Sequence, residues 1–245
     1  MNDIEAAKIL ISCLDLTSLG DKDTDVKIEE LCRKAVTPYG KVAAVCIYPK
    51  FIPLVKRLLG GSEIKTATVV NFPKGTGSIE TVQTEIQNAL KLGADEIDAV
   101  FPYRRFLDGD EEYCRRYLAA VREACGKKHT LKIILETGEI IKAAKIARAA
   151  ELCLEAEVDF IKTSTGKSKI SATPEAANII LETIHAAHKN TGFKASGGIR
   201  TLEEAKKYLV LANAVIGPKA TTPKRLRIGA SSLLDDLLNV IARGY

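Results

Sequence analysis

The sequence predicts an α/β protein, a TIM or (β/α)8 barrel with additional N-terminal helices. Short apolar runs alternate with longer segments of helical periodicity along most of the chain. Eight strand–helix repeats fit into 245 residues, which is close to the usual length of this barrel. Charged residues interrupt several apolar runs near their carboxyl ends, where the loops of such a barrel build a site.

The N-terminal part of the chain has helical rather than strand periodicity. Residues 3–13 and 23–36 carry apolar residues every three or four positions, and residues 15–19 are predicted to form a turn between two helices. We therefore expect a single domain, with a helical segment over residues 1–40 and the barrel over residues 41–245.

The predicted strands are short, apolar and bounded by turn residues. They comprise residues 42–48, 66–72, 95–101, 131–136, 158–163, 192–196, 213–217 and 226–230. Amphipathic helices are predicted over residues 49–59, 79–92, 111–125, 141–156 and 231–241, with two more that begin after Thr173 and Thr201. An open doubly wound sheet also alternates strands and helices. The absence of a G-x-G-x-x-G motif after the first strand disfavours it.

Composition excludes several classes of function. The net charge of +5 is modest, the basic residues are interspersed with acids, and there is no Trp, so nucleic-acid binding is disfavoured. No apolar run approaches the roughly 20 residues that span a bilayer. The six cysteines form no C-x-x-C pair and are expected to be reduced, which favours a cytoplasmic location.

Four consecutive predicted strands carry charged residues inside apolar runs. These residues are Asp98, Lys132, Glu136, Lys162 and Lys194. A single lysine in a predicted strand is more often an outward-pointing side chain whose stem packs on the surface. Three lysines on neighbouring strands, with acids beside them, instead suggest charges that point into a common interior and pair there.

Lys162 is the residue for which this pattern predicts chemistry. It ends the apolar run of residues 158–163, and burial disfavours the charged form of an amine. The neighbouring cation of Lys194 lowers the pKa of Lys162 further, while Asp98 is placed to move protons. An amine activated in this way adds to an aldehyde or ketone to form a Schiff base, which then accepts electrons in carbon–carbon cleavage. This is aldolase chemistry.

Three glycine-containing turns follow predicted strands and predict an anion site. They are Gly166-Lys167, Gly197-Gly198-Ile199-Arg200 and Gly229-Ala230-Ser231-Ser232. Exposed backbone N–H groups and helix N-termini favour a phosphate there. A P-loop is excluded because Ile161 stands where that motif needs its first glycine. His185 and His188 lack a third ligand, so no metal site is predicted.

Five segments together resemble the deoxyribose-phosphate aldolase family, and the similarity extends from Asp15 to Tyr245. These segments are Val45-Cys-Ile-Tyr-Pro49, Glu96-Ile-Asp-Ala-Val-Phe-Pro-Tyr103, Leu131-Lys-Ile-Ile-Leu-Glu-Thr-Gly-Glu139, Phe160-Ile-Lys-Thr-Ser-Thr-Gly-Lys167 and Arg227-Ile-Gly-Ala-Ser-Ser232.

The resemblance implies reversible cleavage of 2-deoxy-D-ribose 5-phosphate to acetaldehyde and D-glyceraldehyde 3-phosphate, without metal or cofactor, by a homodimer. It makes Lys162 the Schiff-base lysine, Lys194 the cation that lowers its pKa, Asp98 the proton relay and Lys132 a residue of the site. The C-terminal Tyr245 is expected to assist proton transfer. Expected phosphate or substrate contacts are Gly166, Lys167, Gly197, Gly198, Arg200, Gly229, Ser231, Ser232, Asp15 and Cys46.

Two other functions fit the same residues. One is a Schiff-base aldolase for a different sugar phosphate, and donor size separates it from an enzyme that uses acetaldehyde. The other is a non-catalytic barrel that binds a phosphorylated metabolite. Such a barrel would bind ligand without turnover and without a trapped imine.

Overall fold

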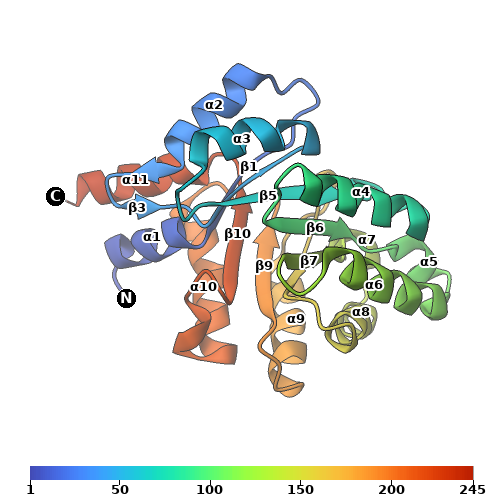
Figure 1. The fold of residues 1–245 in the computed structure, drawn as a ribbon. Helices are drawn as coiled ribbons and strands as arrows, with labels where there is room; N and C mark the ends of the chain where they lie inside the picture. The colour runs from blue at the N-terminus through green and yellow to red at the C-terminus, as the bar shows by residue number, and fades with distance from the viewer. Residues whose placement is uncertain (245) are drawn as a thin grey trace.

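A computed structural model describes residues 1–244, and its centre is a closed barrel of eight parallel strands (Figure 1). This confirms the predicted fold class. In barrel order from β1 the neighbours are β10, β9, β8, β7, β6, β5 and β4. The strands are β1 (Leu14–Ser18), β4 (Ala44–Ile47), β5 (Lys65–Val70), β6 (Glu96–Val100), β7 (Thr130–Ile134), β8 (Phe160–Lys162), β9 (Gly192–Ser196) and β10 (Leu226–Ala230). Strands β2 (Val36–Thr37) and β3 (Gly40–Lys41) form a separate antiparallel hairpin.

Helices surround this barrel. They are α1 (Asp3–Ser12), α2 (Asp25–Lys34), α3 (Ile52–Leu59), α4 (Ile79–Lys91), α5 (Tyr103–Leu107), α6 (Glu111–Cys125), α7 (Thr137–Ile140), α8 (Ala143–Glu155), α9 (Pro174–Ala186), α10 (Leu202–Ile216) and α11 (Leu233–Arg243). Two 3-10 turns, η1 (Pro49–Phe51) and η2 (Pro218–Ala220), complete the elements. Helices α1 and α11 pack together near the two ends of the chain (Figure 1).

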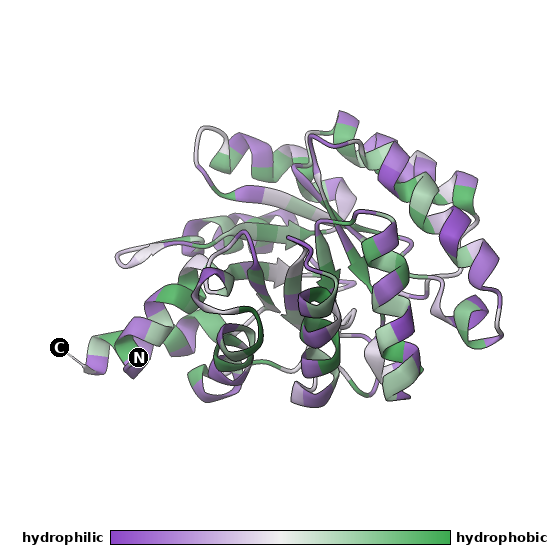
Figure 2. Cartoon of the chain, turned by 90° about the horizontal axis from the view of Figure 1, so that it is seen from below, coloured by the Kyte–Doolittle hydropathy of each residue, from purple (hydrophilic) through white to green (hydrophobic). Residues whose placement is uncertain are grey.

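Local sequence explains where the outer helices begin and which face they bury. Thr201 and Glu204 form the predicted capping box of α10, because each side chain accepts a hydrogen bond from the other's backbone N–H. Thr173 caps α9, and Pro174 occupies the first helical position. Figure 2 shows helices with apolar residues on one side and polar residues on the other. The inner faces of these helices pack on the barrel and form the core.

The first barrel strand lies where the sequence predicted a turn. Residues 15–19 were expected to be irregular, yet Leu14–Ser18 forms β1, which pairs with both β4 and β10. The barrel therefore begins at Leu14, and the boundary expected at residue 41 is wrong. Only α1 precedes the barrel, since α2 follows β1. The polar residues of β1 are of the kind that is typical of turns. Because the pairing partners of this strand are remote in sequence, no local pattern indicated a strand.

The predicted strand over residues 213–217 is also wrong. Residues 213–216 form the last turn of α10, which Gly217 follows with a φ of 95°. Buried residues along this helix recur at Leu202, Ala205, Leu209 and Ala212, a helical period that continues into the apolar run. A short apolar run by itself does not distinguish a strand from a helix end.

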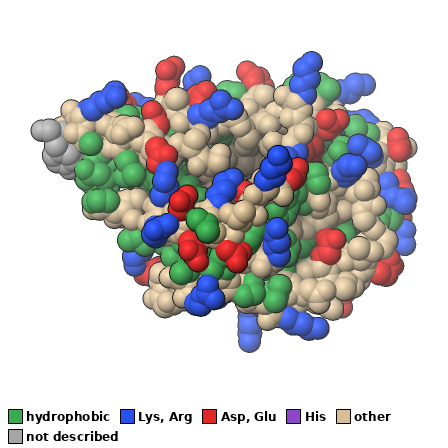
Figure 3. Space-filling view, turned by 90° about the horizontal axis from the view of Figure 1, so that it is seen from above, with side chains coloured by type: hydrophobic (Ala, Val, Ile, Leu, Met, Phe, Trp, Pro, Cys, Tyr) green, Lys and Arg blue, Asp and Glu red, His purple; other side chains and the backbone are tan. Residues whose placement is uncertain are grey.

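The surface agrees with the composition. Basic and acidic side chains are interspersed on the face drawn in Figure 3, without a block of one sign. Within residues 1–244, no helix is both long enough and apolar enough to cross a membrane.

Candidate active site

Strand register places the charged residues of the barrel interior in layers. Parallel barrels fill their interior with side chains from alternate strands at each level. Glu96, Phe160 and Arg227 lie near the amino ends of β6, β8 and β10. The next level holds Asp15, Lys132 and Lys194, and the level above it holds Asp98, Lys162, Cys46 and Gly229.

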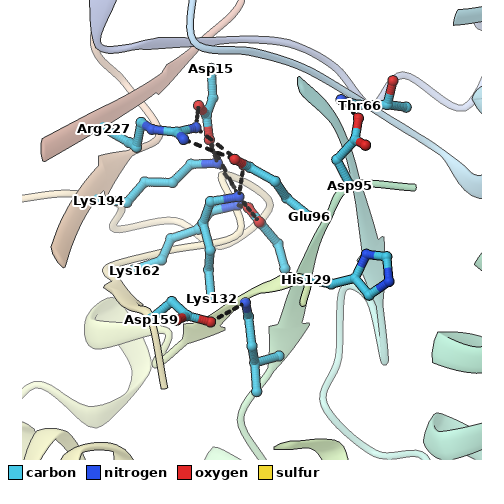
Figure 4. Close-up of polar contacts among 12 residues, drawn as sticks. Asp15, Thr66, Asp95, Glu96, His129, Lys132, Asp159, Lys162, Lys194 and Arg227 are labelled. Carbon is cyan, nitrogen blue, oxygen red and sulfur yellow. Dashed lines mark hydrogen bonds and ion pairs between the residues drawn. The ribbon is translucent and has the colours of Figure 1, made fainter. Parts of the chain in front are cut away.

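Six of these side chains form a closed ring of alternating charge, which comprises Asp98 and five residues of the two lower levels. Figure 4 labels those five residues, Arg227, Glu96, Lys132, Lys194 and Asp15. We call this ring the charge ring; in order around it, its members are Arg227, Glu96, Lys132, Asp98, Lys194 and Asp15. Each carboxylate of the ring accepts from its two neighbouring cations, and Glu96 Oε2 accepts from Arg227 Nη1 at 3.1 Å as well as from Lys132. The ring thus has three positive and three negative charges, all buried, which satisfies the requirement that interior charges be paired.

The contacts around the ring are short. Arg227 Nη2 lies 2.8 Å from Glu96 Oε1, and Glu96 Oε2 lies 2.5 Å from Lys132 Nζ. Asp98 accepts from Lys132 Nζ at 2.8 Å through Oδ1 and from Lys194 Nζ at 2.8 Å through Oδ2. Asp15 closes the ring, because it accepts from Lys194 Nζ at 2.5 Å and from Arg227 Nη1 at 2.6 Å.

Lys162 is attached to this ring without belonging to it. Its Nζ lies 2.9 Å from Asp98 Oδ2, the oxygen that also accepts from Lys194. Lys162 is 3% exposed, whereas Asp98 and Lys194 are fully buried. Because the ring is already neutral, a proton on Lys162 would leave one unbalanced positive charge in the barrel interior. The arrangement therefore favours the neutral amine on Lys162.

The pKa shifts also distinguish Lys162 from the members of the charge ring. Burial lowers the pKa of Lys162, and Lys194 lowers it further, although Asp98 opposes both effects. For Lys194, burial is outweighed by Asp15 and Asp98, which raise its pKa well above the usual value for lysine. Burial would raise the pKa of Asp98, but Lys132, Lys162 and Lys194 hold it well below the usual value for a carboxyl group. Lys194 stays a cation while Lys162 is free to react.

A cavity of about 550 Å³ opens above Lys162 at the carboxyl ends of the strands. Its wall contains Lys162 together with most of the residues expected to bind phosphate. These are Gly166, Lys167, Gly197, Gly198, Arg200, Gly229 and Ser231. Lys167 reaches across the opening, where its Nζ donates to the backbone oxygen of Leu19 at 2.7 Å. The glycine turns that follow the last strands of the barrel and the amine of Lys162 thus line the same cavity.

Glu136 supports one wall of this cavity rather than pointing at the common interior. It follows β7 with a φ of 60° and is 2% exposed. Its carboxylate accepts from the backbone and hydroxyl of Thr165 and from Ser168 Oγ. These bonds fix the turn that carries Gly166 and Lys167.

Other expected residues lie elsewhere. Asp15 is in the charge ring, below the cavity wall, and Cys46 is buried, with its thiol pKa raised chiefly by burial. Ser232 is exposed at the N-cap of α11 and is absent from the described cavity lining. Tyr245 lies outside the described residues. Over residues 1–244, no group of His, Cys, Asp and Glu is arranged to hold a metal ion.

Sequence reasoning assigned no role to Glu96 or Arg227, which complete the ring. A signal was present: each stands two positions before a residue expected in the site, Asp98 or Gly229, on the same face of its strand. Neither could be paired with the other from the sequence, because they are 131 positions apart.

Gly229 is expected to be essential for the position of Lys194. A Cβ at this position would lie 2.9 Å from Ser196 Cβ and 3.0 Å from Lys194 Cε, so Gly229→Ala must move one of them. We expect about a 100-fold loss of catalytic efficiency, since a displacement near 1 Å at a reacting group has an effect of this size. Steady-state kinetics and thermal unfolding measure it. The control is Val210→Ala, because Val210 is an exposed residue of α10 and does not line the described cavity. An unchanged rate in Gly229→Ala would contradict the expected displacement.

A barrel with a buried lysine of lowered pKa below a cavity lined by glycine turns and basic residues has the architecture expected of an aldolase that works through a lysine. Comparisons with known proteins agree. The family model for DeoC/LacD family aldolases matches residues 9–239, and the chain belongs to this family.

Individual relatives cover nearly the whole chain. A deoxyribose-phosphate aldolase of Agrobacterium fabrum (strain C58 / ATCC 33970) is 47% identical over 241 residues, which are 98% of this chain and 93% of the relative. A structure of an apo form from Toxoplasma gondii ME49 matches this chain with a TM-score of 0.89 at 28% identity. The match covers 98% of this chain and 97% of the Toxoplasma chain. A tetrameric deoxyribose phosphate aldolase from Aeropyrum pernix has a TM-score of 0.78 at 25% identity, with 99% and 98% covered.

Proposed function

We propose that this protein is a class I aldolase that reversibly cleaves 2-deoxy-D-ribose 5-phosphate to acetaldehyde and D-glyceraldehyde 3-phosphate. The observation that carries this proposal is the position of Lys162, a buried amine of lowered pKa at the floor of a cavity lined by glycine turns and basic residues. Membership of the DeoC/LacD aldolase family and the 47% sequence identity to the Agrobacterium enzyme support this choice of substrate. Residues 1–245 act as one barrel domain.

The first step is attack of Lys162 Nζ on the C1 aldehyde of the open-chain sugar. An unperturbed lysine is neutral in only about one molecule in a few thousand at pH 7, so a lowered pKa speeds this step directly. Loss of water gives a protonated imine. Asp98, 2.9 Å from Nζ, orients the amine and exchanges protons with it.

The cleavage step breaks the bond between C2 and C3 of the sugar. Removal of the proton from the C3 hydroxyl lets its electrons form the carbonyl of D-glyceraldehyde 3-phosphate, while the C2–C3 electron pair moves into the imine. This leaves an enamine on Lys162. Protonation at C2 and addition of water then release acetaldehyde and regenerate the amine. We assign the relay of these protons to Asp98, with Lys194 and Lys132 holding its charge.

We assign the phosphate to the glycine turns and basic residues of the cavity lining. Gly197 and Gly198 have φ values of 90° and 80°, a region that favours glycine, so the turn exposes its backbone toward an anion. Lys167 and Arg200 add positive charge to the same wall. The distance between the phosphate and the aldehyde then sets the length of sugar that fits.

Lys167→Met is expected to raise KM for 2-deoxy-D-ribose 5-phosphate by about 10- to 100-fold with little change in kcat, because a charged hydrogen bond to phosphate contributes about 1.5–3 kcal/mol. Cleavage of unphosphorylated 2-deoxyribose is expected to be unaffected. Lys169→Met is the matched control, since Lys169 is exposed two residues away and does not line the described cavity. An equal loss with both substrates would show that Lys167 does not bind the phosphate.

The experiment that tests the function is reductive trapping. Incubation with acetaldehyde and borohydride, followed by peptide mass spectrometry, is expected to place a single two-carbon adduct on Lys162. Dihydroxyacetone phosphate is expected to leave no adduct, because the proposed donor has two carbons. An adduct with dihydroxyacetone phosphate instead would indicate an aldolase for another sugar phosphate. No adduct on Lys162 would indicate a barrel that binds a phosphorylated metabolite only.

We further infer a homodimer in the cytoplasm. Family resemblance supports the dimer, while the tetrameric Aeropyrum pernix relative makes four subunits the alternative, and sedimentation velocity separates the two. All six cysteines are free and buried, in keeping with a reducing compartment.

A further inference from the structure

Arg227 and Glu96 lie at the amino end of the barrel, on the side of the charge ring away from the cavity over Lys162. Both line a separate pocket of about 1050 Å³ at that end, and neither lines the cavity described above. They are nonetheless among the most completely bonded side chains of the interior. We propose that Arg227 and Glu96 are positioning residues that close the charge ring and thereby keep Lys162 uncharged and reactive. This role rests on the proposed function.

Arg227 is held in one orientation by contacts from three directions. Its Nε donates to the backbone oxygen of Pro223 at 2.6 Å, and its guanidinium lies 5.4 Å from the centre of the Phe160 ring. Its Nη atoms bond Asp15 and Glu96. At 6% exposure, a guanidinium with this many partners is a fixed positive charge.

Glu96 connects that fixed charge to Lys132. One carboxylate oxygen receives Arg227 Nη2, and the other receives Lys132 Nζ at 2.5 Å. Without Glu96, Lys132 would depend on Asp98 and on a longer contact with Asp15 of 3.7 Å. Glu96 thus gives Lys132 a second short carboxylate contact besides its bond to Asp98 Oδ1 at 2.8 Å.

Charge balance explains the effect on Lys162. Asp98, Lys194 and Cys46 act on Lys162 directly. Lys132 and Asp15 lie behind them, bonded to Asp98 and Lys194, and Glu96 and Arg227 complete the ring below. Lys167 and Arg200 line the cavity above Lys162 and are the same in all variants. The Cys46 thiol has a raised pKa and is uncharged at neutral pH, so it adds nothing to the balance. Loss of Arg227 would leave three carboxylates with two cations. A proton on Lys162 would then restore neutrality, at the cost of its nucleophilicity.

Glu96→Gln has the opposite expected effect. Two carboxylates would then face Arg227, Lys132 and Lys194, so a further proton on Lys162 becomes less favourable. The pair of variants therefore predicts shifts of opposite sign in the pKa of Lys162. The double variant, which removes one charge of each sign, returns the balance to that of the natural protein.

The test measures the pH dependence of imine formation with acetaldehyde, trapped with cyanoborohydride and quantified at Lys162. Arg227→Met is expected to move the rising limb of this pH profile to higher pH by about one unit or more. This is the effect expected of one charge several ångströms away in a protein interior. Glu96→Gln is expected to move it to lower pH. The double variant and Arg227→Lys, which keeps the charge, are expected to lie close to the natural protein.

Thermal unfolding of each variant separates this role from a purely structural one. Loss of stability with an unmoved limb in Arg227→Met, or shifts of the same sign in both single variants, would overturn the proposal. If Arg227→Met does not fold, Glu96→Gln decides, since an unmoved limb there overturns the proposal equally. Imine formation by the natural protein tests the proposed aldolase function itself. If its Lys162 forms no adduct, the aldolase function is refuted, whereas the role of the charge ring is refuted by the outcomes given above for the variants.

Discussion

Replacement of Lys162 with leucine is expected to abolish the trapped adduct with acetaldehyde and to lower aldol cleavage by at least about 10⁴-fold, the loss typical when a covalent nucleophile is removed. Lys132 and Lys194 cannot substitute for it, because each is bound by two carboxylates of the charge ring and stays protonated. Peptide mass spectrometry after reduction measures the adduct. Coupled assay of D-glyceraldehyde 3-phosphate measures the rate.

The matched control for this variant is Lys169→Leu. Lys169 follows Lys162 by seven positions and is exposed, so its loss is expected to leave the adduct on Lys162 and the rate unchanged. The fold of Lys162→Leu is expected to be retained, since removal of an uncharged amine leaves the ring balanced. A two-carbon adduct that persists in Lys162→Leu at the level of the natural protein would refute the assignment of the nucleophile.

The second large effect is expected for Lys194→Leu. Asp15 and Asp98 each lose one cation, and Lys162 is left as the partner of Asp98 Oδ2, the oxygen that it shares with Lys194 in the natural protein. The pKa of Lys162 rises as a result. Because the neutral amine is the nucleophile, the rising limb of kcat/KM moves to higher pH. A rise of two units would lower the rate at pH 7 by about 100-fold.

Lys194→Leu is also expected to lower the free energy of unfolding by about 3–5 kcal/mol, because two buried carboxylates, Asp15 and Asp98, each lose one of their cation partners. Lys128→Leu serves as the control, since Lys128 is an exposed lysine before β7. The pH profile and denaturant unfolding are measured on the same preparations. A pH profile of Lys194→Leu that coincides with that of the natural protein would contradict the coupling between the two lysines.

Local sequence patterns were sufficient for most of the fold. Helical periodicity and caps such as Thr201 with Glu204 depend on residues three or four positions apart, so the outer helices were predicted close to their observed bounds. The two errors have different origins. Residues 14–18 form a strand only through partners remote in the chain, whereas residues 213–216 continue α10 and were misassigned because a short apolar run does not distinguish a strand from a helix end.

The sequence by itself determined that lysines and an acid lie inside a barrel of alternating strands and helices, and that Lys162 is the candidate nucleophile. The chemistry of a lysine within an apolar run is a local property, since burial alone disfavours its charge. Only the tertiary structure decided how these charges pair. The closing contact, from Arg227 to Asp15, joins residues 212 positions apart, and strand register in the closed barrel sets it. The charge ring, and with it the lowered pKa of Lys162, exists only once that register is formed.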